Sequence, residues 1–345
     1  MMPITEQRYV WMNGEFVEWD RANVPILTHA LHYGTAVFEG IRAYKTGEGL
    51  SVFRLKEHMC RLKASARAYM IDLPYSETEL CNATTALLER NEIHASAYIR
   101  PIAFKAVGGI EIDMREVPTW VAIVAFPYEK YFKKEGLDVC VSSWRKTAEP
   151  SVPSLAKATG HYINAVLAKV EAAQNGFDEA IFLDQRGFVS EGTGENIFIV
   201  KHETLHTPPL SAGILDGVTR DTLRTLAYDH NLKLQERDIA RSELYTCDEA
   251  FFTGTAAEIA PILSIDRRKV GEGRAGPLTR RVQKLYSEVV AGNDKRYHQW
   301  LTPVYLRGSS KAGSDITAGV SPHRTGLTFA NWELQFWEWT RPQGP

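Results

Sequence analysis

One lysine lies in a setting that suits covalent chemistry. Lys157 stands among small residues in the stretch 154–162 (SLAKATGHY), just before an expected helix. A partly desolvated lysine stays deprotonated often enough to attack a carbonyl and form a Schiff base. Tyr162 follows five residues later, near enough for its hydroxyl to reach the same ligand. Taken alone, such a lysine is more commonly a solvated surface residue.

Two carboxylates four residues apart form a second candidate group. Glu191 and Glu195 lie in residues 190–196 (SEGTGEN), with glycines between them that let a backbone pass close to a ligand. A carboxylate beside a pyridine nitrogen keeps that nitrogen protonated, which an electron-sink cofactor requires. A polar hairpin loop explains the same letters equally well.

Two short segments offer backbone amides to an anion. Residues 215–221 (LDGVTRD) lead into a helix whose free N–H groups suit a phosphate, with the Thr219 hydroxyl beside them, and residues 254–257 (GTAA) follow a strand. Each alone is typical of an ordinary loop. Together with Lys157 and Glu191, they fit one ligand that carries a phosphate, a carbonyl and a protonatable ring. Pyridoxal 5′-phosphate is such a ligand.

The elements that must position these residues alternate irregularly, which favours an α+β fold over a doubly wound sheet. A hairpin is expected at 9–17 around Asn13-Gly14, because both residues tolerate positive φ. Apolar spacing predicts helices at 55–69, 77–90, 161–175, 219–230 and 278–290. Expected strands are 97–104, 120–126, 138–143, 179–183, 187–189, 197–200, 249–252 and 259–265.

The charged stretch after the strand at 120–126 is the predicted linker. It divides the chain into a smaller domain at 1–128, a linker at 129–136 and a larger domain at 137–305. Residues 271–276 (GEGRAG) match the dinucleotide fingerprint G-x-G-x-x-G, but no complete βαβ unit can follow them. A tight turn before a helix that begins near Pro277 is the better interpretation.

Composition narrows the class of protein. The 345 residues suggest two domains, and the formal charge of −2 supplies no broad basic face for nucleic acid. Apolar content of 44% and charged content of 24% are typical of a folded globular chain. The four cysteines (Cys60, Cys81, Cys140 and Cys247) form no C-x-x-C pair, so we expect reduced thiols and no metal site. The longest apolar run, 120–126, is too short for a membrane span, and with no signal peptide evident we expect a cytoplasmic protein.

The composition changes from residue 306 onward. Residues 307–319 are small and polar, and the segment after them is rich in aromatic residues, namely Trp332, Phe336, Trp337 and Trp339. We predict that residues 306–345 are dispensable for catalysis. An aromatic cluster that docks on this chain or on a partner is the alternative.

Six motifs in a fixed order carry a family resemblance. They are 32–42 (HYGTAVFEGIR), 53–62 (FRLKEHMCRL), 97–101 (AYIRP), 157–162 (KATGHY), 190–196 (SEGTGEN) and 254–258 (GTAAE). From about residue 9 to 305 the chain resembles branched-chain-amino-acid aminotransferases of the fold-type IV pyridoxal-phosphate class. The resemblance implies a two-domain α+β architecture, with a smaller N-terminal α+β domain and a larger C-terminal, mixed β-barrel-like domain with helices.

The resemblance also implies a role for each matching residue. Lys157 would form the Schiff base and shuttle the α-proton, Glu191 would face the pyridine nitrogen, and Tyr162 would face the phenolic oxygen. The implied phosphate ligands are Arg61, Thr219 and Thr255, with the backbone amides of Val218 and Thr255. Its helix alone would place Arg61 on a solvated face.

The implied substrate pocket is apolar except where carboxylates bind. Its implied residues are Tyr33, Phe38, Tyr131 and Tyr162 for the walls, and Tyr98 with the amides of Thr255 and Ala256 for the α-carboxylate. Arg100 has two interpretations, a clamp for the acceptor's carboxylate or a structural pair with Glu39 or Glu195. The loop 105–113, which contains Ile110 and Ile112, corresponds to one that tends to reach a neighbouring active site in this family.

The resemblance predicts reversible amino transfer between branched-chain L-amino acids (Leu, Ile, Val) and 2-oxoglutarate, a step of branched-chain amino-acid biosynthesis. It also predicts a homodimer or higher homo-oligomer. Three activities of the same fold remain as alternatives: D-amino-acid transamination, R-selective amine transamination and aminodeoxychorismate lyase activity. A two-domain binding protein would leave Lys157 without a chemical role. The sequence does not rank leucine, isoleucine and valine, since one methylene is worth only ~1–3 kcal/mol.

Overall fold

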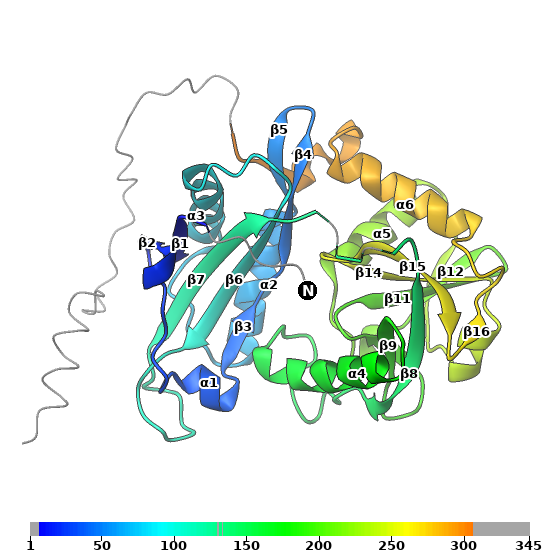
Figure 1. Cartoon of the computed structure of the whole chain (residues 1–345), viewed down its shortest axis with the longest axis horizontal. Helices are drawn as coiled ribbons and strands as arrows, with labels where there is room; N and C mark the ends of the chain where they lie inside the picture. Colours follow the sequence, from blue (N-terminus) through cyan, green and yellow to red (C-terminus); the bar gives the residue numbers. More distant parts are fainter. Residues whose placement is uncertain (1–6, 130, 133, 306–345) are drawn as a thin grey trace, which may run out of the picture. The chain divides into compact units, whose positions relative to one another are not determined.

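The computed structural model describes residues 7–129, 131–132 and 134–305, which form helices and two β-sheets (Figure 1). The first sheet has eight strands in the order β17-β5-β4-β6-β7-β1-β2, with β3 paired to β6. Its strands are β1 (Tyr9–Met12), β2 (Glu15–Glu18), β3 (Ala36–Phe38), β4 (Ile41–Thr46), β5 (Gly49–Phe53), β6 (Ala97–Lys105), β7 (Thr119–Pro127) and β17 (Leu301–Pro303). All the pairings in this sheet are antiparallel.

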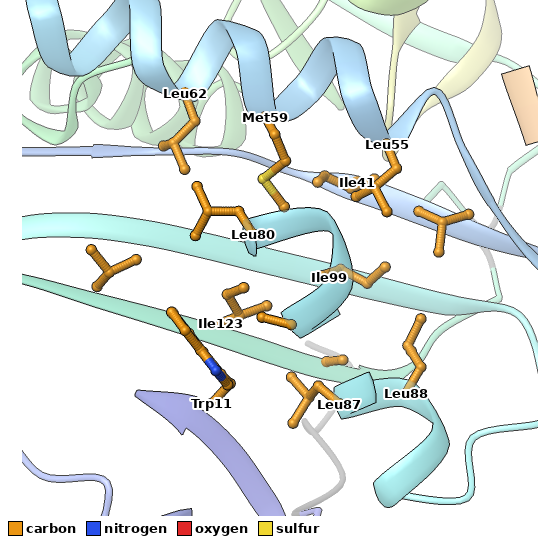
Figure 2. Close-up of a cluster of buried hydrophobic side chains, with 14 of the residues drawn as sticks. Trp11, Ile41, Leu55, Met59, Leu62, Leu80, Leu87, Leu88, Ile99 and Ile123 are labelled. Atoms are coloured by element: carbon orange, nitrogen blue, oxygen red, sulfur yellow. The ribbon is translucent and has the colours of Figure 1, made fainter. Parts of the chain in front are cut away.

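Two amphipathic helices cover the first sheet. They are α2 (Leu55–Ala68) and α3 (Glu77–Arg90), and Ser76 caps α3 through a capping box with Glu79. Their apolar faces meet the sheet in one buried cluster (Figure 2), to which α2 contributes Met59 and Leu62. The other labelled members are Trp11, Ile41, Leu55, Leu80, Leu87, Leu88, Ile99 and Ile123. This core fixes α2, which carries Arg61, against the sheet.

The second sheet has nine strands in the order β10-β9-β8-β15-β14-β11-β12-β13, with β16 paired to β15. It is mixed, because β8 runs parallel to both β9 and β15, and β12 runs parallel to β13. Its strands are β8 (Leu137–Arg145), β9 (Glu179–Leu183), β10 (Val189–Gly192), β11 (Asn196–Lys201), β12 (Thr204–Thr207), β13 (Leu234–Glu236), β14 (Glu249–Gly254), β15 (Glu258–Ile265) and β16 (Arg268–Lys269).

Three long helices pack against the second sheet: α4 (Tyr162–Gln174) on β8 and β9, α5 (Val218–Asp229) on β14, and α6 (Pro277–Val290) on β14 and β15 (Figure 1). The short helices are α1 (His29–Tyr33) and the 3-10 turns η1 (Trp19–Arg21), η2 (Thr159–His161), η3 (Leu210–Ala212), η4 (Arg241–Tyr245) and η5 (Lys295–Trp300). The mixture of helices with an antiparallel and a mixed sheet agrees with the predicted α+β class.

The sheets change over between β7 and β8, around the predicted linker. Residues 301–303 nevertheless return as β17 to pair with β5 of the first sheet. The predicted domain boundaries at 128, 136 and 305 stay predictions. The predicted role of residues 306–345, with their aromatic cluster, concerns a segment that lies outside the described residues. No helix within the described part of the chain combines the length and apolar character that a membrane span needs.

Several sequence predictions can be compared with this fold directly. Asn13 and Gly14 both have positive φ and join β1 to β2, as the hairpin prediction requires. The 271–276 segment is a turn with positive φ at Gly271 and Gly273, and Pro277 begins α6 directly after it. The sequence analysis missed β3, β4, β5, β12, β13, β16, β17 and α1.

Candidate active site

One pocket gathers the residues that the sequence analysis singled out from distant segments. Both sheets contribute to it, through α2 on one side and through the strand ends and helix beginnings of the second sheet on the other. Seven predicted residues line it: Arg61, Lys157, Tyr162, Glu191, Val218, Thr219 and Thr255. Because Arg61, residues 157–162, Glu191, residues 218–219 and Thr255 lie far apart in the chain, the fold and not the local sequence assembles this site.

Lys157 is held at its backbone and at its amine. Its N–H donates to Ser65 Oγ at 3.0 Å, and its carbonyl accepts from the N–H of Phe38 at 3.0 Å. Lys157 Nζ donates to the hydroxyl of Tyr162 at 2.7 Å. The rings of Phe38 and Tyr162 lie with their centroids 5.0 and 5.3 Å from the amine. An amine held beside two aromatic rings and a phenol is placed for Schiff-base chemistry.

Glu191 is the next-to-last residue of β10, and both of its carboxylate oxygens have partners. Its Oε2 accepts from Asn196 Nδ2 and from the N–H of Leu215, each at 3.0 Å. Its Oε1 lies 2.6 Å from Lys146 Nζ. The residue is only 5% exposed, so these partners fix the direction of its carboxylate.

Arg61 faces the pocket, not the solvated face that its helix suggests. Its Nε and Nη2 donate to the two oxygens of Glu39 at 2.6 and 2.8 Å, and its Nη1 donates to the carbonyl of Asp216 at 2.7 Å. Glu39 is fully buried and also bonds His58 Nδ1 at 2.8 Å. Burial acts to raise the pKa of Glu39, but Arg61 and His58 outweigh it and hold that pKa well below its usual range.

The start of α5 supplies free amides to the pocket. Gly217 is its N-cap residue and provides no side-chain cap, and Val218 and Thr219 follow it along the pocket wall. A Cβ on Gly217 would overlap the side-chain oxygen of Asn196. The hydroxyl of Thr253, which also lines the pocket, is buried and has no hydrogen-bond partner in the described structure. Uncapped amides and a spare hydroxyl fit a phosphate group.

The start of α6 shows the contrast. There the carboxylate of Glu249 accepts from the N–H groups of Leu278 and Thr279 at 3.0 and 2.7 Å. A protein carboxylate therefore already occupies the helix end that follows the G-x-G-x-x-G match. Of these two helix starts, α5 is the one that is open to an anion.

Glu195 is a second carboxylate in the pocket. Its Oε2 accepts from the N–H of Gly194 at 3.1 Å. Burial, reinforced by the nearby carboxylate of Glu179, raises its pKa to about 8. Unlike Glu191, this side chain has no cation within ion-pair distance among the described residues, so it holds a proton near neutral pH.

Three of the predicted substrate residues form a wall beside Lys157. The Phe38 ring packs edge-on against the Tyr162 ring, with centroids 4.8 Å apart. The guanidinium of Arg100 lies over the rings of Phe38 and Tyr98 and donates to the Tyr98 hydroxyl at 2.9 Å. Among the described contacts, Arg100 pairs with neither Glu39 nor Glu195, and its buried Nε has no partner. The structural-pair interpretation of Arg100 is therefore not found.

Of the remaining predicted substrate residues, Thr255 lines the pocket itself, whereas Tyr33, Tyr131 and Ala256 do not. Tyr33 is 43% exposed, and its hydroxyl donates to the carbonyl of Ile110 at 2.5 Å. Tyr131 is 44% exposed and borders a separate cavity beside Phe132 and Lys169. Ala256 is half-buried in the turn after β14, next to Thr255. The side chains of Tyr33, Tyr131 and Ala256 are therefore not among those that line the Lys157 pocket.

Comparison with known proteins decides the family. The sequence model of amino-transferase class IV matches residues 36–265. The branched-chain-amino-acid aminotransferase of Salmonella typhimurium is 43% identical over 303 residues, which are 86% of this chain and 97% of that protein. The chain belongs to the class IV aminotransferases. The corresponding protein of Pseudomonas aeruginosa is 44% identical with the same coverage.

Solved aminotransferase structures share the whole fold. The branched-chain aminotransferase of Thermoproteus uzoniensis with norvaline has a TM-score of 0.84 and 46% identity, covering 87% of this chain and all of that one. The branched-chain amino acid aminotransferase of Thermobaculum terrenum, in its PLP-form, has a TM-score of 0.83 and 38% identity, covering 87% of this chain and 99% of that one.

These findings confirm the recognised family, the fold-type IV architecture, the branched-chain aminotransferase class and pyridoxal 5′-phosphate as the cofactor. The alternative activities of the fold are not favoured, since the relatives carry the branched-chain name.

The aminotransferase pocket also contains residues that the sequence analysis missed. Lys146, His161, Asn196 and Thr253 line it. Asn196 stood inside the SEGTGEN motif, which was a usable signal. Lys146 follows the end of β8, where a lysine has no distinctive sequence pattern, and only the fold brings it to Glu191.

Proposed function

We propose that the chain catalyses reversible amino transfer between branched-chain L-amino acids (Leu, Ile, Val) and 2-oxoglutarate, with pyridoxal 5′-phosphate bound in the pocket around Lys157. One observation carries the proposal: the Lys157 amine, bonded to Tyr162 at 2.7 Å, shares a pocket with Glu191 and the open start of α5. It does so in a chain 43% identical over most of its length to a protein named for this activity.

The pocket residues would contact three parts of the cofactor: its ring nitrogen, its phenolic oxygen and its phosphate. Pyridoxal 5′-phosphate, when bound, supplies an electron sink for the substrate's α-carbon. Glu191 would hold the proton on the ring nitrogen, and Tyr162 would donate to the phenolic oxygen. The groups proposed to hold the phosphate are Arg61, Thr219 and Thr255, with the amides of Val218 and Thr255. The open amides of α5 and the spare hydroxyl of Thr253 support this placement of the phosphate.

Lys157 has two proposed tasks, covalent attachment of the cofactor and transfer of the proton at the substrate's α-carbon. Both need an amine that is neutral part of the time. The Tyr162 hydroxyl holds Nζ in place, and the flanking rings of Phe38 and Tyr162 limit the water that reaches it. The backbone bond to Ser65 fixes the base of the side chain.

The wall formed by Phe38, Tyr98 and Arg100 is the proposed substrate side. Phe38 offers an apolar surface to a branched side chain, and the Tyr98 hydroxyl suits a carboxylate. The buried Nε of Arg100, which has no partner in the described structure, supports the interpretation that Arg100 clamps the acceptor's carboxylate. The amides of Thr255 and Ala256 are proposed for the α-carboxylate.

A second copy of the chain is the proposed partner. Apolar side chains lie exposed around α1, in the loop whose Ile110 carbonyl bonds Tyr33, and along and just before α4. Thr159 Oγ1 in η2, directly before α4, donates to the carbonyl of Gly34 directly after α1. The exposed apolar side chains are Ile26, Leu27, Leu31, Tyr33, Ile110, Ile112, Leu155, Ile163, Val166, Leu167 and Val170, and we call them the α1–α4 apolar face. An exposed apolar surface of this kind is typical of a protein interface. Tyr33 and the predicted neighbour-reaching loop lie on it, which supports a homodimer.

Steady-state rates test the proposal. The purified chain, loaded with pyridoxal 5′-phosphate, is assayed for glutamate formation from 2-oxoglutarate with L-leucine, L-isoleucine, L-valine, D-alanine and an (R)-amine as donors. We expect turnover with the three branched-chain L-amino acids and little with the last two. Preferential use of D-alanine or of the (R)-amine would contradict the proposal, as would failure of the loaded protein to absorb in the visible range.

A further inference from the structure

Lys146 is a pocket residue that the proposed roles leave unexplained. It follows β8, and its backbone is anchored on both sides: its N–H donates to the carbonyl of Leu183 at 2.9 Å, and its carbonyl accepts from the Gln185 side chain at 2.8 Å. Its ammonium lies 5.6 Å from the centroid of the Phe182 ring. This anchoring directs the side chain into the pocket, where its Nζ reaches Glu191.

The ion pair with Lys146 gives the second carboxylate oxygen of Glu191 a partner. Oε2 already accepts two hydrogen bonds, from Asn196 and Leu215, and Lys146 engages Oε1 at 2.6 Å. The Lys146 side chain is 20% exposed and that of Glu191 is 7% exposed. Within the described structure, Lys146 is the cation within ion-pair distance of Glu191. Without it, a buried carboxylate would keep only two neutral donors on one oxygen, and its charged form would lose much of its stabilisation.

We propose that Lys146 is a positioning residue for the cofactor's ring nitrogen: it holds Glu191 ionised and in a fixed direction, so that the shared proton stays on the nitrogen. This inference rests on the proposed function and deepens it. The sign of this electrostatic effect follows from the distances between the charges. The ammonium of Lys146 lies 2.6 Å from the carboxylate of Glu191, and a ring nitrogen that bound this carboxylate would lie farther from the ammonium than the carboxylate does. The charge of Lys146 therefore favours the negative charge on Glu191 more than it opposes a positive charge on the nitrogen.

Lys146 opposes a state in which Glu191 is protonated and the ring nitrogen is neutral. A single proton shared between the Glu191 carboxylate and a ring nitrogen can rest on either group. If it rests on Glu191, the ring is neutral and a weaker electron sink. Removal of the Lys146 charge shifts the equilibrium toward this neutral arrangement. Replacement of Lys146 by methionine removes the charge and keeps the shape of the pocket, because methionine fills nearly the same volume along the Phe182 ring.

Three single variants of the holoenzyme test the proposal: Lys146→Met, Lys146→Arg, and Lys134→Met as a matched control. Lys134 also pairs with a carboxylate at 2.6 Å, that of Asp178, but it does not line the Lys157 pocket. The half-reaction with L-leucine is followed in a single turnover by the absorbance of the bound cofactor. The protonation of the ring nitrogen is followed separately, by the ¹⁵N chemical shift of ¹⁵N-labelled cofactor in each purified protein.

We expect Lys146→Met to slow the half-reaction about ten- to a hundredfold, the loss typical when a residue that orients a metal-binding side chain is removed. Its ¹⁵N signal should move toward that of a neutral pyridine. Lys146→Arg should keep most of the rate and the parent signal, and Lys134→Met should keep both. A Lys146→Met protein with the parent's rate and signal overturns the proposal. So does a slow variant whose ¹⁵N signal is unchanged, because that result indicates a purely structural role.

A double-mutant cycle with Glu191→Gln checks that Lys146 acts through Glu191. With no carboxylate charge to hold, Lys146→Met should cost much less in the Glu191→Gln protein than in the parent. Equal costs in the two backgrounds would overturn the proposal. If the parent enzyme itself did not transaminate L-leucine, the proposed function would fail first, and the two failures are thereby distinguishable.

Discussion

At the scale of single residues, the Lys157 amine is the group on which the chemistry depends most. We expect Lys157→Ala to reduce the rate with L-leucine by at least roughly 1,000-fold, because covalent attachment and proton transfer both need this amine. The side chain is only partly buried, so the thermal unfolding midpoint should change little. Lys63→Ala, at a half-buried pair with Glu77, is the matched control and should keep its activity. Substantial turnover by Lys157→Ala would remove Lys157 from the mechanism.

Glu195 makes stability depend on pH. Its pKa is about 8 in the folded chain against an ordinary value of 4.5, because of burial and the neighbouring carboxylate of Glu179. Between these values the folded state holds a proton that the unfolded state has released, so the free energy of unfolding falls as pH rises through this window. Lys169 and the N–H of Gly194 oppose the shift, and Glu191 adds to it.

Glu195→Gln should remove this dependence. Measured by urea unfolding at several pH values from about 5 to about 8, the parent should lose at least about 1 kcal/mol more than the variant, since one pKa unit corresponds to about 1.4 kcal/mol. Other groups titrate in both proteins, and their contributions cancel in the difference. Parallel pH profiles for the two proteins would show that Glu195 is ionised throughout.

Residue types and spacing were enough to predict Lys157, Tyr162, Glu191 and Thr219, because each stands in a short segment whose letters already suggest a ligand. Arg61 came from the resemblance alone. A helical pattern shows which side of a helix is apolar, but not that a guanidinium on the other side reaches a buried Glu39 from another strand end. Such long-range polar pairs leave no local trace in a sequence.

At the scale of elements, helices were easier to predict than strands. The helices α2, α3, α4, α5 and α6 carry apolar stripes or capping residues and lie within a few residues of their expected ranges. The hairpin of β4 and β5 was missed because consecutive residues on both of its faces are buried, including Arg42 and Ser51. Without alternation of apolar and polar residues, the two-residue period that marks a strand disappears.

The start of α5 gives an element-scale prediction. Gly217 has an ordinary φ of −75°, so alanine is allowed by the backbone, but its Cβ would overlap Asn196. Gly217→Ala should therefore displace both the open amides of α5 and the Asn196 partner of Glu191. We expect about a tenfold or greater loss in pyridoxal 5′-phosphate affinity, measured by titration of the cofactor-free protein. Gly47→Ala, where a Cβ has open space, is the control. Unchanged affinity in Gly217→Ala would separate α5 from the phosphate.

At the scale of the whole molecule, the α1–α4 apolar face should determine the oligomeric state. Val166 lies on α4 and is 52% exposed, so glutamate there leaves the core intact but places a charge in the proposed interface. We expect Val166→Glu to shift the protein from dimer to monomer in light scattering and to lower its activity. Tyr228→Glu, at an exposed position on α5, should remain dimeric. A parent that is monomeric at micromolar concentration would contradict the homodimer proposal.

Truncation of the C-terminal segment is the largest change that we propose to the molecule. The Salmonella typhimurium and Pseudomonas aeruginosa relatives are each matched over 97% of their length by 86% of this chain, so 14% of this chain has no counterpart in them. Residues 301–305 belong to the fold itself: β17 pairs with β5, and the Tyr305 hydroxyl donates to the carbonyl of Ile93 at 2.9 Å.

A chain that ends at Tyr305 should therefore keep the rate with L-leucine, the dimer and the unfolding midpoint. A chain that ends at Trp300 should be less stable, because it loses an edge strand and the Tyr305 anchor. Loss of activity or dimerisation in the chain that ends at Tyr305 would show that the segment with Trp332, Phe336, Trp337 and Trp339 is a working part of the enzyme.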